Sequence, residues 1–578
     1  MLPAQETQVQ VHILTDWTWK YWRNAVLDTC NKLPRRDFLQ LMAGAAATSL
    51  SGSSLAGPLP PVFAGASPVR GPKGKGSNGA SKTRKPNIVL IVADDWAYMD
   101  LGIAGHPLLQ TPNLDRLARE GVRFTRAFTP NPICTPSRAA LLTGQDCWTN
   151  GCYFFGMPIK PESKHFARLL SQAGYETFYT GKWHNDGLPS QRGFTAGKYI
   201  GGGGPGAGGH FKPMVKDFGG ANKRRIEQFD SELFTDAAVQ FLHSRRPDPA
   251  EGGHDQTRRA AGPFLLFISY MTPHDPWTPP GKYATMYKPQ AIELPPNFMP
   301  RPMNGSEPFK YYTDWHGKNL RDEKQMVPFP RTPAGLRDVR SRYYGTITHD
   351  DDQIGRILDK LDEQQLTEDT LVIFLADHGI SLGAHGISGK QTMYEEGIRL
   401  PLVMRYPRLK RGSAENSNLV SLIDIFPTIC EAAGIAIPDS IEGKSLLGLY
   451  RGKAGTHRER IFASFVSPTR HRLNIRCIRT ERYKLIHHLT TDEVELYDLK
   501  EDPYELNNLA RQKRFSRLKK RLMAELLAWR TKAESKAGLS RRVRDTAGSP
   551  DASFGMSPGF SRLITRLGPE RNTERSHP

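Results

Sequence analysis

Runs of consecutive apolar residues alternate along this chain with segments in which apolar residues recur every three or four positions. A short apolar run is typical of a strand buried on both faces, and the longer repeat is typical of an amphipathic helix. The predicted strands are 87–93, 176–181, 264–270, 370–377 and 399–406. The predicted helices are 112–120, 134–143, 163–174, 231–246 and 341–363. This alternation predicts a mainly parallel sheet covered by helices on both faces.

The pattern changes near residue 457. Three short segments rich in strand-forming residues lie at 461–466, 476–489 and 493–499. A single predicted helix follows them at 516–530. We therefore predict a main α/β domain over residues 86–456 and a C-terminal α+β subdomain over 457–530. Residues 531–578 are polar, basic and rich in glycine, serine and proline, so a disordered basic tail is expected there.

Residues 34–66, within the first 85 residues that precede the predicted folded part, are predicted to direct export. Arg35 and Arg36 precede a mild apolar run rich in alanine and glycine, an order that resembles a twin-arginine signal peptide over residues 34–66. Residues 1–33 form a leader of unknown role, and residues 67–85 a flexible basic linker. No apolar run reaches the ~20 residues of a spanning helix. We expect export by the twin-arginine machinery to the periplasm or medium, without stable membrane insertion.

Charge and cysteine content narrow the function classes. The chain has 79 Lys and Arg against 59 Asp and Glu, a formal net charge of +20. Such a charge suggests acidic partners, but the basic residues are scattered and no nucleic-acid-binding motif accompanies them. We expect a solvated basic surface and no nucleic-acid partner. Six cysteines are too few for a disulfide scaffold, and Cys147 with Cys152 is either a bridge or a pair of free thiols.

The predicted helix 134–143 begins at an unusual residue. Pro136 suits a first helical turn and Gly144 a C-terminus, which places Cys134 at the helix start. Ser, Thr, Asp or Asn normally caps the free N–H groups there, and cysteine is a poor cap. The thiol is either made acidic by the helix terminus or converted into another group. Because no general base is evident beside it in the sequence, conversion is favoured.

Acidic residues follow two of the predicted strands. Asp94 and Asp95 end the strand 87–93, and Asp377 and His378 end another. Ligand sites in such sheets lie at the carboxyl ends of strands, where adjacent carboxylates repel unless they share a cation or a proton. Three carboxylates and a histidine suit a hard divalent ion such as Ca²⁺ or Mg²⁺ better than zinc. Either pair alone could be a turn or a helix cap, but two strand ends of one sheet favour a metal.

Basic residues follow further strands and the same loops. These are Lys182, His184, His274, His385 and Lys390. With Arg138 they predict a cationic cluster around the metal, which stabilisation of a tetrahedral oxyanion requires. Two features are expected to carry no chemistry: His385, as a solvated loop residue, and the glycine-rich stretch 201–209. The latter lacks the spacing of a phosphate loop and is expected to be a mobile surface insertion near the site.

Together these motifs resemble the signature of the type I, formylglycine-dependent sulfatases of the alkaline phosphatase superfamily. Cys-Thr-Pro-Ser-Arg at 134–138 matches the family element Cys-x-Pro-x-Arg. ADD, GKWH, TPHDPW, ADHG and ELYDLKEDPYELNNLA continue the match from residue 86 to about 530. The resemblance implies a large mixed, mostly parallel sheet sandwiched by helices, with a smaller C-terminal antiparallel sheet plus helix. It also implies that a formylglycine-generating maturation enzyme oxidises Cys134 to Cα-formylglycine.

The resemblance implies a role for each candidate residue. The implied ligands of one divalent cation, usually Ca²⁺, are Asp94, Asp95, Asp377, His378 and the modified Cys134. The implied residues that balance the sulfate charge are Arg138, Lys182 and Lys390. One hydroxyl of the hydrated aldehyde attacks sulfur, His184 is the base that helps release sulfate, and His274, helped by Lys390, protonates the leaving alcohol. Some members have Asn where His378 stands, which leaves Mg²⁺ open as the metal.

The sequence thus predicts an exported sulfuric ester hydrolase. Its basic charge and loop-rich site favour a sulfated carbohydrate over a small aryl ester. A phosphonate or phosphate ester hydrolase on the same scaffold and a catalytically silent protein that binds sulfated glycans are the alternatives. Substrate specificity is expected to depend on residues 186–225, residues 276–335 and the C-terminal subdomain.

Overall fold

The computed structural model describes residues 85–204, 208–245, 262–302, 331–409, 412–466 and 474–537. The predicted leader (1–33), signal peptide (34–66) and nearly all of the linker (67–85) lie outside the described residues. So does the predicted tail from residue 538 onward. Among the helices of the described part, none is long and apolar enough to cross a membrane.

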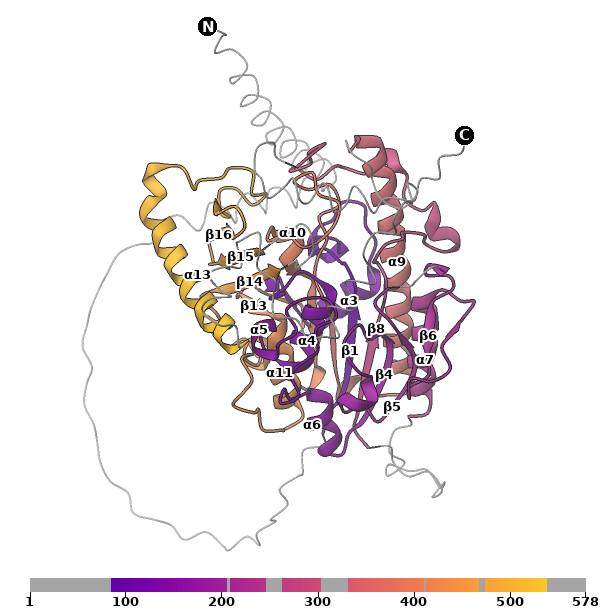
Figure 1. Ribbon diagram of the computed structural model, residues 1–578. Coiled ribbons are helices and arrows are strands. Elements are labelled where there is room, and N and C mark those ends of the chain that lie inside the picture. The colour runs from indigo at the N-terminus through magenta and orange to yellow at the C-terminus, as the bar shows by residue number, and fades with distance from the viewer. Residues whose placement is uncertain are drawn as a thin grey trace, which may run out of the picture. The chain divides into compact units, whose positions relative to one another are not determined.

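A ten-stranded sheet is the centre of the main domain (Figure 1). Its strands are β1 (Asn87–Ala93), β2 (Val122–Phe124), β4 (Glu176–Lys182), β5 (Ala196–Gly201), β6 (Met214–Lys216), β7 (Arg224–Arg225), β8 (Phe264–Ser269), β9 (Thr370–Ala376), β11 (Leu402–Arg405) and β12 (Ala414–Asn416). Their order is β12-β2-β11-β9-β1-β8-β4-β5-β6-β7. The run β9-β1-β8-β4-β5 is parallel throughout, whereas β11 is antiparallel to β9 and β2. The predicted mixed, mostly parallel sheet is confirmed.

Helices cover both faces of this sheet (Figure 1). The helices of the main domain are α3 (Pro112–Arg119), α4 (Cys134–Thr143), α5 (Cys147–Asn150), α6 (Phe166–Gln172), α7 (Asp230–His243), α9 (Pro333–Glu363), α10 (Glu395–Ile398), α11 (Ile425–Ala432) and α12 (Leu447–Tyr450). Helices α3 and α7 pack on α9, and α4 and α6 pack on α11. Every residue of β1, β8 and β9 is buried. Central strands covered on both faces explain why these segments read as unbroken apolar runs.

Three predicted elements differ in detail. Helix α9 begins at Pro333 rather than at residue 341, because Thr332 accepts a hydrogen bond from the Gly335 N–H and caps it. Helix α3 begins at Pro112 as predicted but ends at Arg119 rather than at residue 120, and the hydroxyl of Thr111 before it donates to Asp115 Oδ1 (2.9 Å) instead of capping the helix.

The predicted strand 399–406 is also divided. Its first part, β10 (Arg399–Leu400), pairs with β3 (Ala127–Phe128), and β3 pairs with β13 (Val420–Ser421) in a separate three-stranded sheet. The break falls at Pro401, which has no N–H to donate to a neighbouring strand. Only the second part, β11, therefore continues in the large sheet.

The C-terminal subdomain is a four-stranded antiparallel sheet with one long helix. Its elements are β14 (Ile461–Val466), β15 (Asn474–Arg479), β16 (Tyr483–His488), β17 (Glu493–Asp498) and α13 (Ser516–Lys536). Leu522 and Leu526 of α13 pack against Ile478 and Leu485 of the sheet. The predicted sheet and helix are confirmed, but α13 continues to Lys536, so the expected tail cannot begin at residue 531.

Asp424, just before α11, binds several residues of the segment that connects the main domain to this subdomain. Its buried carboxylate accepts the N–H groups of Ser421 and Lys444, each at 2.8 Å, and contacts Arg458 and His457. Burial raises the pKa of Asp424, but the charge of Arg458 and the hydrogen bonds from His457 and Arg458 lower it to about 2. The ionised form is therefore the one that stabilises the fold.

We expect Asp424→Asn to lower the free energy of unfolding by about 3 kcal/mol at pH 7, because Arg458 then loses its buried partner. The folded pKa lies below the ordinary value of 3.8, so the contribution of the charge is present above pH 3.8 and is lost as pH falls toward 2. Urea unfolding at pH 7, 4 and 3 should show the wild-type and variant curves converging. A difference that stays constant over this range would contradict the assignment.

Candidate active site

The predicted site residues at strand ends meet at one edge of the sheet. Asp94 and Asp95 follow β1, and Asp377 and His378 follow β9, which pairs with β1 in register at Ala93 and Ala376. Lys182 is the last residue of β4, and Ser269 the last residue of β8, which lies between β4 and β1. Parallel strands that end at the same edge thus bring residues from four chain segments together, as predicted.

Cys134 is the first residue of α4 rather than its cap, a position held by Ile133 without a side-chain hydrogen bond. Its Sγ lies 3.3 Å from Asp94 Oδ1, 3.3 Å from His378 Nε2 and 3.3 Å from Lys390 Nζ. The residue is buried, with 1% of its surface exposed. The sequence did not reveal that His378 lies beside the thiol.

Electrostatics around Cys134 favour a negative charge. Burial and Asp94 raise the pKa of the thiol, but Lys182, Lys390 and His378 lower it to about 6. Burial lowers the pKa of His378, whereas Asp377 and Cys134 raise it to about 9. His378 is therefore a cation at neutral pH and stabilises an anion at position 134 instead of removing a proton from it.

Lysines neutralise the two carboxylates that follow β1. Lys182 Nζ contacts Asp94, and both groups are fully buried. Lys390 Nζ contacts Asp95 Oδ1 at 2.7 Å and Oδ2 at 2.9 Å. Burial raises the pKa of each carboxyl, yet the charges of Lys182 on Asp94 and of Lys390 on Asp95 hold both below the ordinary range. Both aspartates are therefore ionised.

Asp377 is held by Arg138 and by the backbone beside the other acidic groups. Its Oδ2 accepts a hydrogen bond from Arg138 Nε at 2.8 Å, and its Oδ1 accepts one from the His378 N–H at 2.9 Å. Arg138 also donates to Ser269 Oγ at 2.6 Å, and its Nη2 has no hydrogen-bond partner among the described residues. One buried guanidinium nitrogen is thus left available for an anion.

Four of the five predicted metal ligands form a compact group. The possible ligand atoms of Asp94, Asp95, Cys134 and His378 all lie within 4.8 Å of one another, and all four residues are buried. Asp377 is outside that group. Two carboxylates fit a hard divalent cation, and an oxygen in place of the sulfur at position 134 would improve the fit. The donor set therefore suits the ion that the sequence predicted.

The two predicted acid–base histidines flank this group. His274 Nε2 lies 3.8 Å from Asp95 Oδ2, while its Nδ1 contacts the Asp275 carbonyl at 2.7 Å. His274 is 21% exposed, so one ring nitrogen faces the buried site and the side chain remains accessible. The Nδ1 of His184 has no hydrogen-bond partner among the described residues. Burial and Lys182 hold the pKa of His184 well below its ordinary value, so this ring is neutral.

His385 is not the solvated loop residue that we expected. It is 1% exposed and its ring stacks on Tyr394 with centroids 3.7 Å apart. Its Nε2 lies 3.0 Å from Asn297 Nδ2. The surrounding glycines let this loop fold inward, so their presence did not indicate exposure.

Sequence reasoning missed several residues that support the site. Ser269 accepts from Arg138 and donates to the Lys182 carbonyl at 2.8 Å. Tyr343 of α9 donates to the Asp95 carbonyl at 3.0 Å. The strand-end rule that found Asp94 would have found Ser269, whereas nothing local marks Tyr343, which is 248 residues from Asp95 in the chain.

The remaining cysteines of the described part carry no bridge. Cys147, Cys152, Cys430 and Cys477 are free and buried. Cys147 and Cys152 are therefore two thiols, one of the two possibilities left open by the sequence. Burial raises the pKa of Cys152, so this thiol is not the anionic kind found at Cys134.

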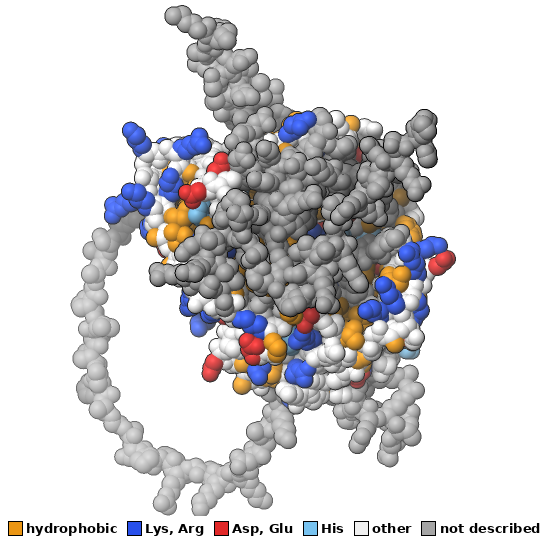
Figure 2. Space-filling model, in the orientation of Figure 1, with side chains coloured by type: hydrophobic (Ala, Val, Ile, Leu, Met, Phe, Trp, Pro, Cys, Tyr) orange, Lys and Arg blue, Asp and Glu red, His pale blue; other side chains and the backbone are white. Residues whose placement is uncertain are grey.

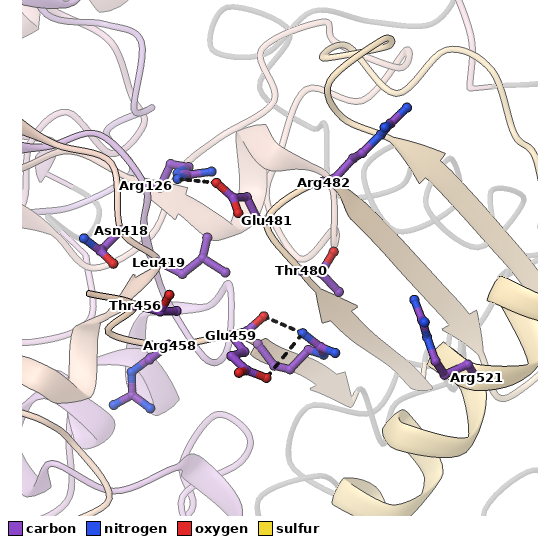
Figure 3. A pocket seen from close by; sticks show the side chains of 11 residues that line it. Arg126, Asn418, Leu419, Thr456, Arg458, Glu459, Thr480, Glu481, Arg482 and Arg521 are labelled. Carbon is purple, nitrogen blue, oxygen red and sulfur yellow. Dashed lines mark hydrogen bonds and ion pairs between the residues drawn. The ribbon is translucent and has the colours of Figure 1, made fainter. Parts of the chain in front are cut away.

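An arginine-lined hollow lies between the main domain and the C-terminal subdomain, with a volume of about 360 Å³ (Figure 3). None of the predicted site residues lines it. Its guanidinium groups are paired: Arg458 with Asp424, Arg460 with Glu525 and Arg482 with Asp498. On the visible face of the molecule, Lys and Arg side chains are likewise dispersed among acidic ones (Figure 2). We assign this hollow no catalytic role.

Fold and site together define an enzyme whose centre holds a negatively charged group among buried cations and carboxylates. The family model "Sulfatase" matches residues 86–435, and the model "N-sulphoglucosamine sulphohydrolase, C-terminal" matches residues 383–532. The chain belongs to the sulfatase family and is a sulfuric ester hydrolase, as the sequence predicted.

Relatives that are themselves sulfatases match this sequence over most of its length. It is 28% identical over 496 residues to N-acetylglucosamine-6-O-sulfatase of Bacteroides thetaiotaomicron, covering 76% of this chain and 86% of that one. It is 30% identical over 493 residues to arylsulfatase of Clostridium perfringens, covering 76% and 94%. A solved structure in complex with its substrate D-glucosamine-2-N,6-O-disulfate has a TM-score of 0.66 at 24% identity, covering 78% and 99%. This last likeness confirms the fold.

Proposed function

We propose that this enzyme hydrolyses sulfate esters of carbohydrates through a formylglycine made from Cys134 and one divalent cation, with Ca²⁺ favoured over Mg²⁺. The observation that carries the proposal is the position of Cys134. It lies at the start of α4, in contact with Asp94, His378 and Lys390. Its surroundings stabilise an anion, so a hydrated aldehyde at this position would supply an oxygen nucleophile, and a divalent cation held by the neighbouring carboxylates would favour its ionisation.

The proposed cation is held by the compact acidic group and by residue 134. Asp94, Asp95 and His378 would supply side-chain ligands, with His378 losing its ring proton when the metal binds. Asp377 would contribute through Oδ1, since Arg138 occupies its Oδ2. Lys182 contacts Asp94, and Lys390 contacts Asp95. Because the cation would neutralise these carboxylates, the two lysines would be available to balance the charge of the sulfate together with Arg138. The free Nη2 of Arg138 supports this assignment.

The two histidines divide the proton transfers. His274 donates from Nε2 to the oxygen of the leaving alcohol, because its Nδ1 is engaged by the Asp275 carbonyl. Lys390 contacts Asp95, the carboxylate that His274 Nε2 faces, and so assists this donation by its charge. His184 is neutral and unpartnered at Nδ1, so it is able to accept a proton at residue 134 when sulfate is released.

Relatives support a sulfated sugar as the substrate. One relative is an N-acetylglucosamine-6-O-sulfatase. The solved structure with the similar fold contains its substrate, a glucosamine disulfate. The accessible side of His274 is where the leaving alcohol would lie. The sequence of residues 34–66 supports export by the twin-arginine machinery, which carries folded proteins and so allows maturation of Cys134 in the cytoplasm before export.

Mass spectrometry of the peptide that contains residue 134 tests the proposal. Protein produced natively should carry an aldehyde in place of the thiol of Cys134, while Cys152 in the same digest stays a thiol. An intact thiol at 134 in protein that turns over sulfate esters would refute the formylglycine mechanism. Rates on the sulfate and phosphate esters of one alcohol address the phosphatase alternative, and faster turnover of the phosphate would favour it.

A further inference from the structure

The glycine-rich stretch, expected to carry no chemistry, lies at the catalytic edge of the sheet. Strand β5 is parallel to β4 and ends at Gly201, which pairs with Lys182. The Trp183 N–H donates to the Gly201 carbonyl at 3.1 Å. The chain that leaves β5 therefore starts next to the segment that carries Lys182 and His184. Residues 202–204 and 208–210 of this stretch are described.

Gly203 packs directly against the ring of His184. A Cβ atom on Gly203 would lie 2.6 Å from Nε2, 2.9 Å from Cδ2 and 3.0 Å from Cε1 of that ring. Its neighbours differ, because a Cβ on Gly202 or Gly204 would meet no heavy atom of the described residues within 4 Å. The ring of Phe155 also lies close, with centroids 5.5 Å apart. Packing thus positions the His184 ring, and of the three glycines 202–204 only Gly203 lacks room for a side chain.

At the other end of the stretch, His210 holds the backbone of His274. His210 Nε2 lies 2.8 Å from the His274 carbonyl oxygen, and Nδ1 lies 2.7 Å from Asp230 Oδ2. Both His210 and Asp230 are fully buried. Because a carbonyl and a carboxylate only accept hydrogen bonds, the ring satisfies both by donating from both nitrogens, as an imidazolium. Burial lowers the pKa of His210, but Asp230 raises it above the ordinary value, which agrees with a charged ring.

The contact between His210 and the His274 carbonyl also restrains the side chain of His274. The carbonyl that His210 binds belongs to the peptide group between His274 and Asp275, and the next carbonyl, that of Asp275, contacts His274 Nδ1 at 2.7 Å. Fixing this peptide group therefore fixes the carbonyl that orients the ring. The opposite nitrogen, Nε2, is the one that faces Asp95.

We propose that Gly203 and His210, described residues within and just after the glycine-rich stretch, position the two acid–base histidines: the backbone of Gly203 seats His184, and the His210–Asp230 ion pair orients His274. The inference rests on the roles proposed above for these two histidines. It makes His210 and Asp230 positioning residues for the step in which the alcohol leaves, and Gly203 a positioning residue for the later release of sulfate.

The first test compares leaving groups. His210→Ala is expected to lower kcat on 4-methoxyphenyl sulfate roughly 10- to 100-fold, because its phenolate needs a proton, and to leave 4-nitrophenyl sulfate within about twofold. Asp230→Asn keeps the shape of the pair but removes its charge, and should show the same selectivity to a smaller extent. His210→Gln retains an N–H for the His274 carbonyl and should restore part of the rate. Equal losses on both esters, or no loss on either, would overturn the role of His210.

His274→Ala is the control for the underlying function. It should show the same selectivity with a loss of roughly 100-fold or more. If His274→Ala lowers kcat equally on both esters, His274 is not the acid and the proposed function is wrong. If His274→Ala is selective for the methoxyphenyl ester but the His210 and Asp230 variants are not, only the positioning inference is wrong.

The second test uses the three neighbouring glycines. Gly203→Ala is expected to lower kcat about 10-fold or more on both esters, because His184 acts after the alcohol has left. Gly202→Ala and Gly204→Ala are matched controls that should stay within about twofold of the wild type. None of these three glycines has a positive φ, so alanine adds no backbone strain. Equal behaviour of all three variants would overturn the role of Gly203.

Discussion

Cys134→Ala is expected to abolish turnover, with kcat on 4-nitrophenyl sulfate falling by at least about 10⁴-fold. Alanine can neither be converted to an aldehyde nor supply any other nucleophile at the start of α4. The cations proposed to receive the sulfate, Arg138, Lys182 and Lys390, remain in place. We therefore expect the variant to bind a sulfate ester in calorimetry while failing to hydrolyse it, a combination that separates loss of the nucleophile from loss of the site.

The matched control is Cys152→Ala. Cys152 is as buried as Cys134, but its sulfur makes only a long contact, 4.0 Å, with the Phe154 carbonyl. This variant should retain turnover within about twofold, and melting temperatures should show that both proteins are folded. Hydrolysis by Cys134→Ala at a tenth of the wild-type rate or more would show that residue 134 is not the nucleophile.

The acidic thiol of Cys134 has a simple physical meaning. Its low pKa does not require a catalytic thiolate, because Lys182, Lys390 and His378 would stabilise any anion placed at the start of α4. The sequence left two interpretations of Cys134 open, an acidic thiol and a precursor. The structure reconciles them, since surroundings that ionise sulfur are the same surroundings that would favour an ionised oxygen there.

Site residues at the ends of strands could be predicted from the sequence more directly than site residues in loops. Asp94, Lys182 and His274 were found because buried parallel strands are recognisable as apolar runs, and their carboxyl ends share an edge of the sheet. Lys390 lies in the loop that follows Asp377, and the sequence predicted it as a member of the cationic cluster for that reason. The atoms that it contacts could not be read from the pattern of apolar residues.

Long-range contacts account for what the sequence did not reveal. His210 meets Asp230 and the His274 carbonyl across 20 and 64 residues, and no local spacing indicates such a pair. Glycines around Gly203 and His385 suggested mobile surface, yet both segments pack against neighbouring rings. Glycine permits close approach as readily as it permits flexibility, so its abundance alone does not distinguish the two.

Removing the proposed cation is expected to stop catalysis without unfolding the protein. Asp94 and Asp95 are buried, and buried carboxylates without partners destabilise a fold strongly. Here Lys182 and Lys390 are within contact distance of them, so each carboxylate keeps a counter-charge when the ion is lost. After chelation we expect turnover to fall at least about 10³-fold, while the melting temperature falls by only about 5 °C.

Adding back Ca²⁺ or Mg²⁺ should restore turnover, and the ion that acts at the lower concentration is the proposed resident metal. Asp95→Asn serves as the matched variant: it should lose a similar share of its activity, and added cation should not restore it, because one ligand is missing. Its Lys390 also loses a buried partner, so a lower melting temperature is expected than for the chelated wild type. Full turnover by wild-type protein shown by elemental analysis to be metal-free would eliminate the cation from the proposed chemistry.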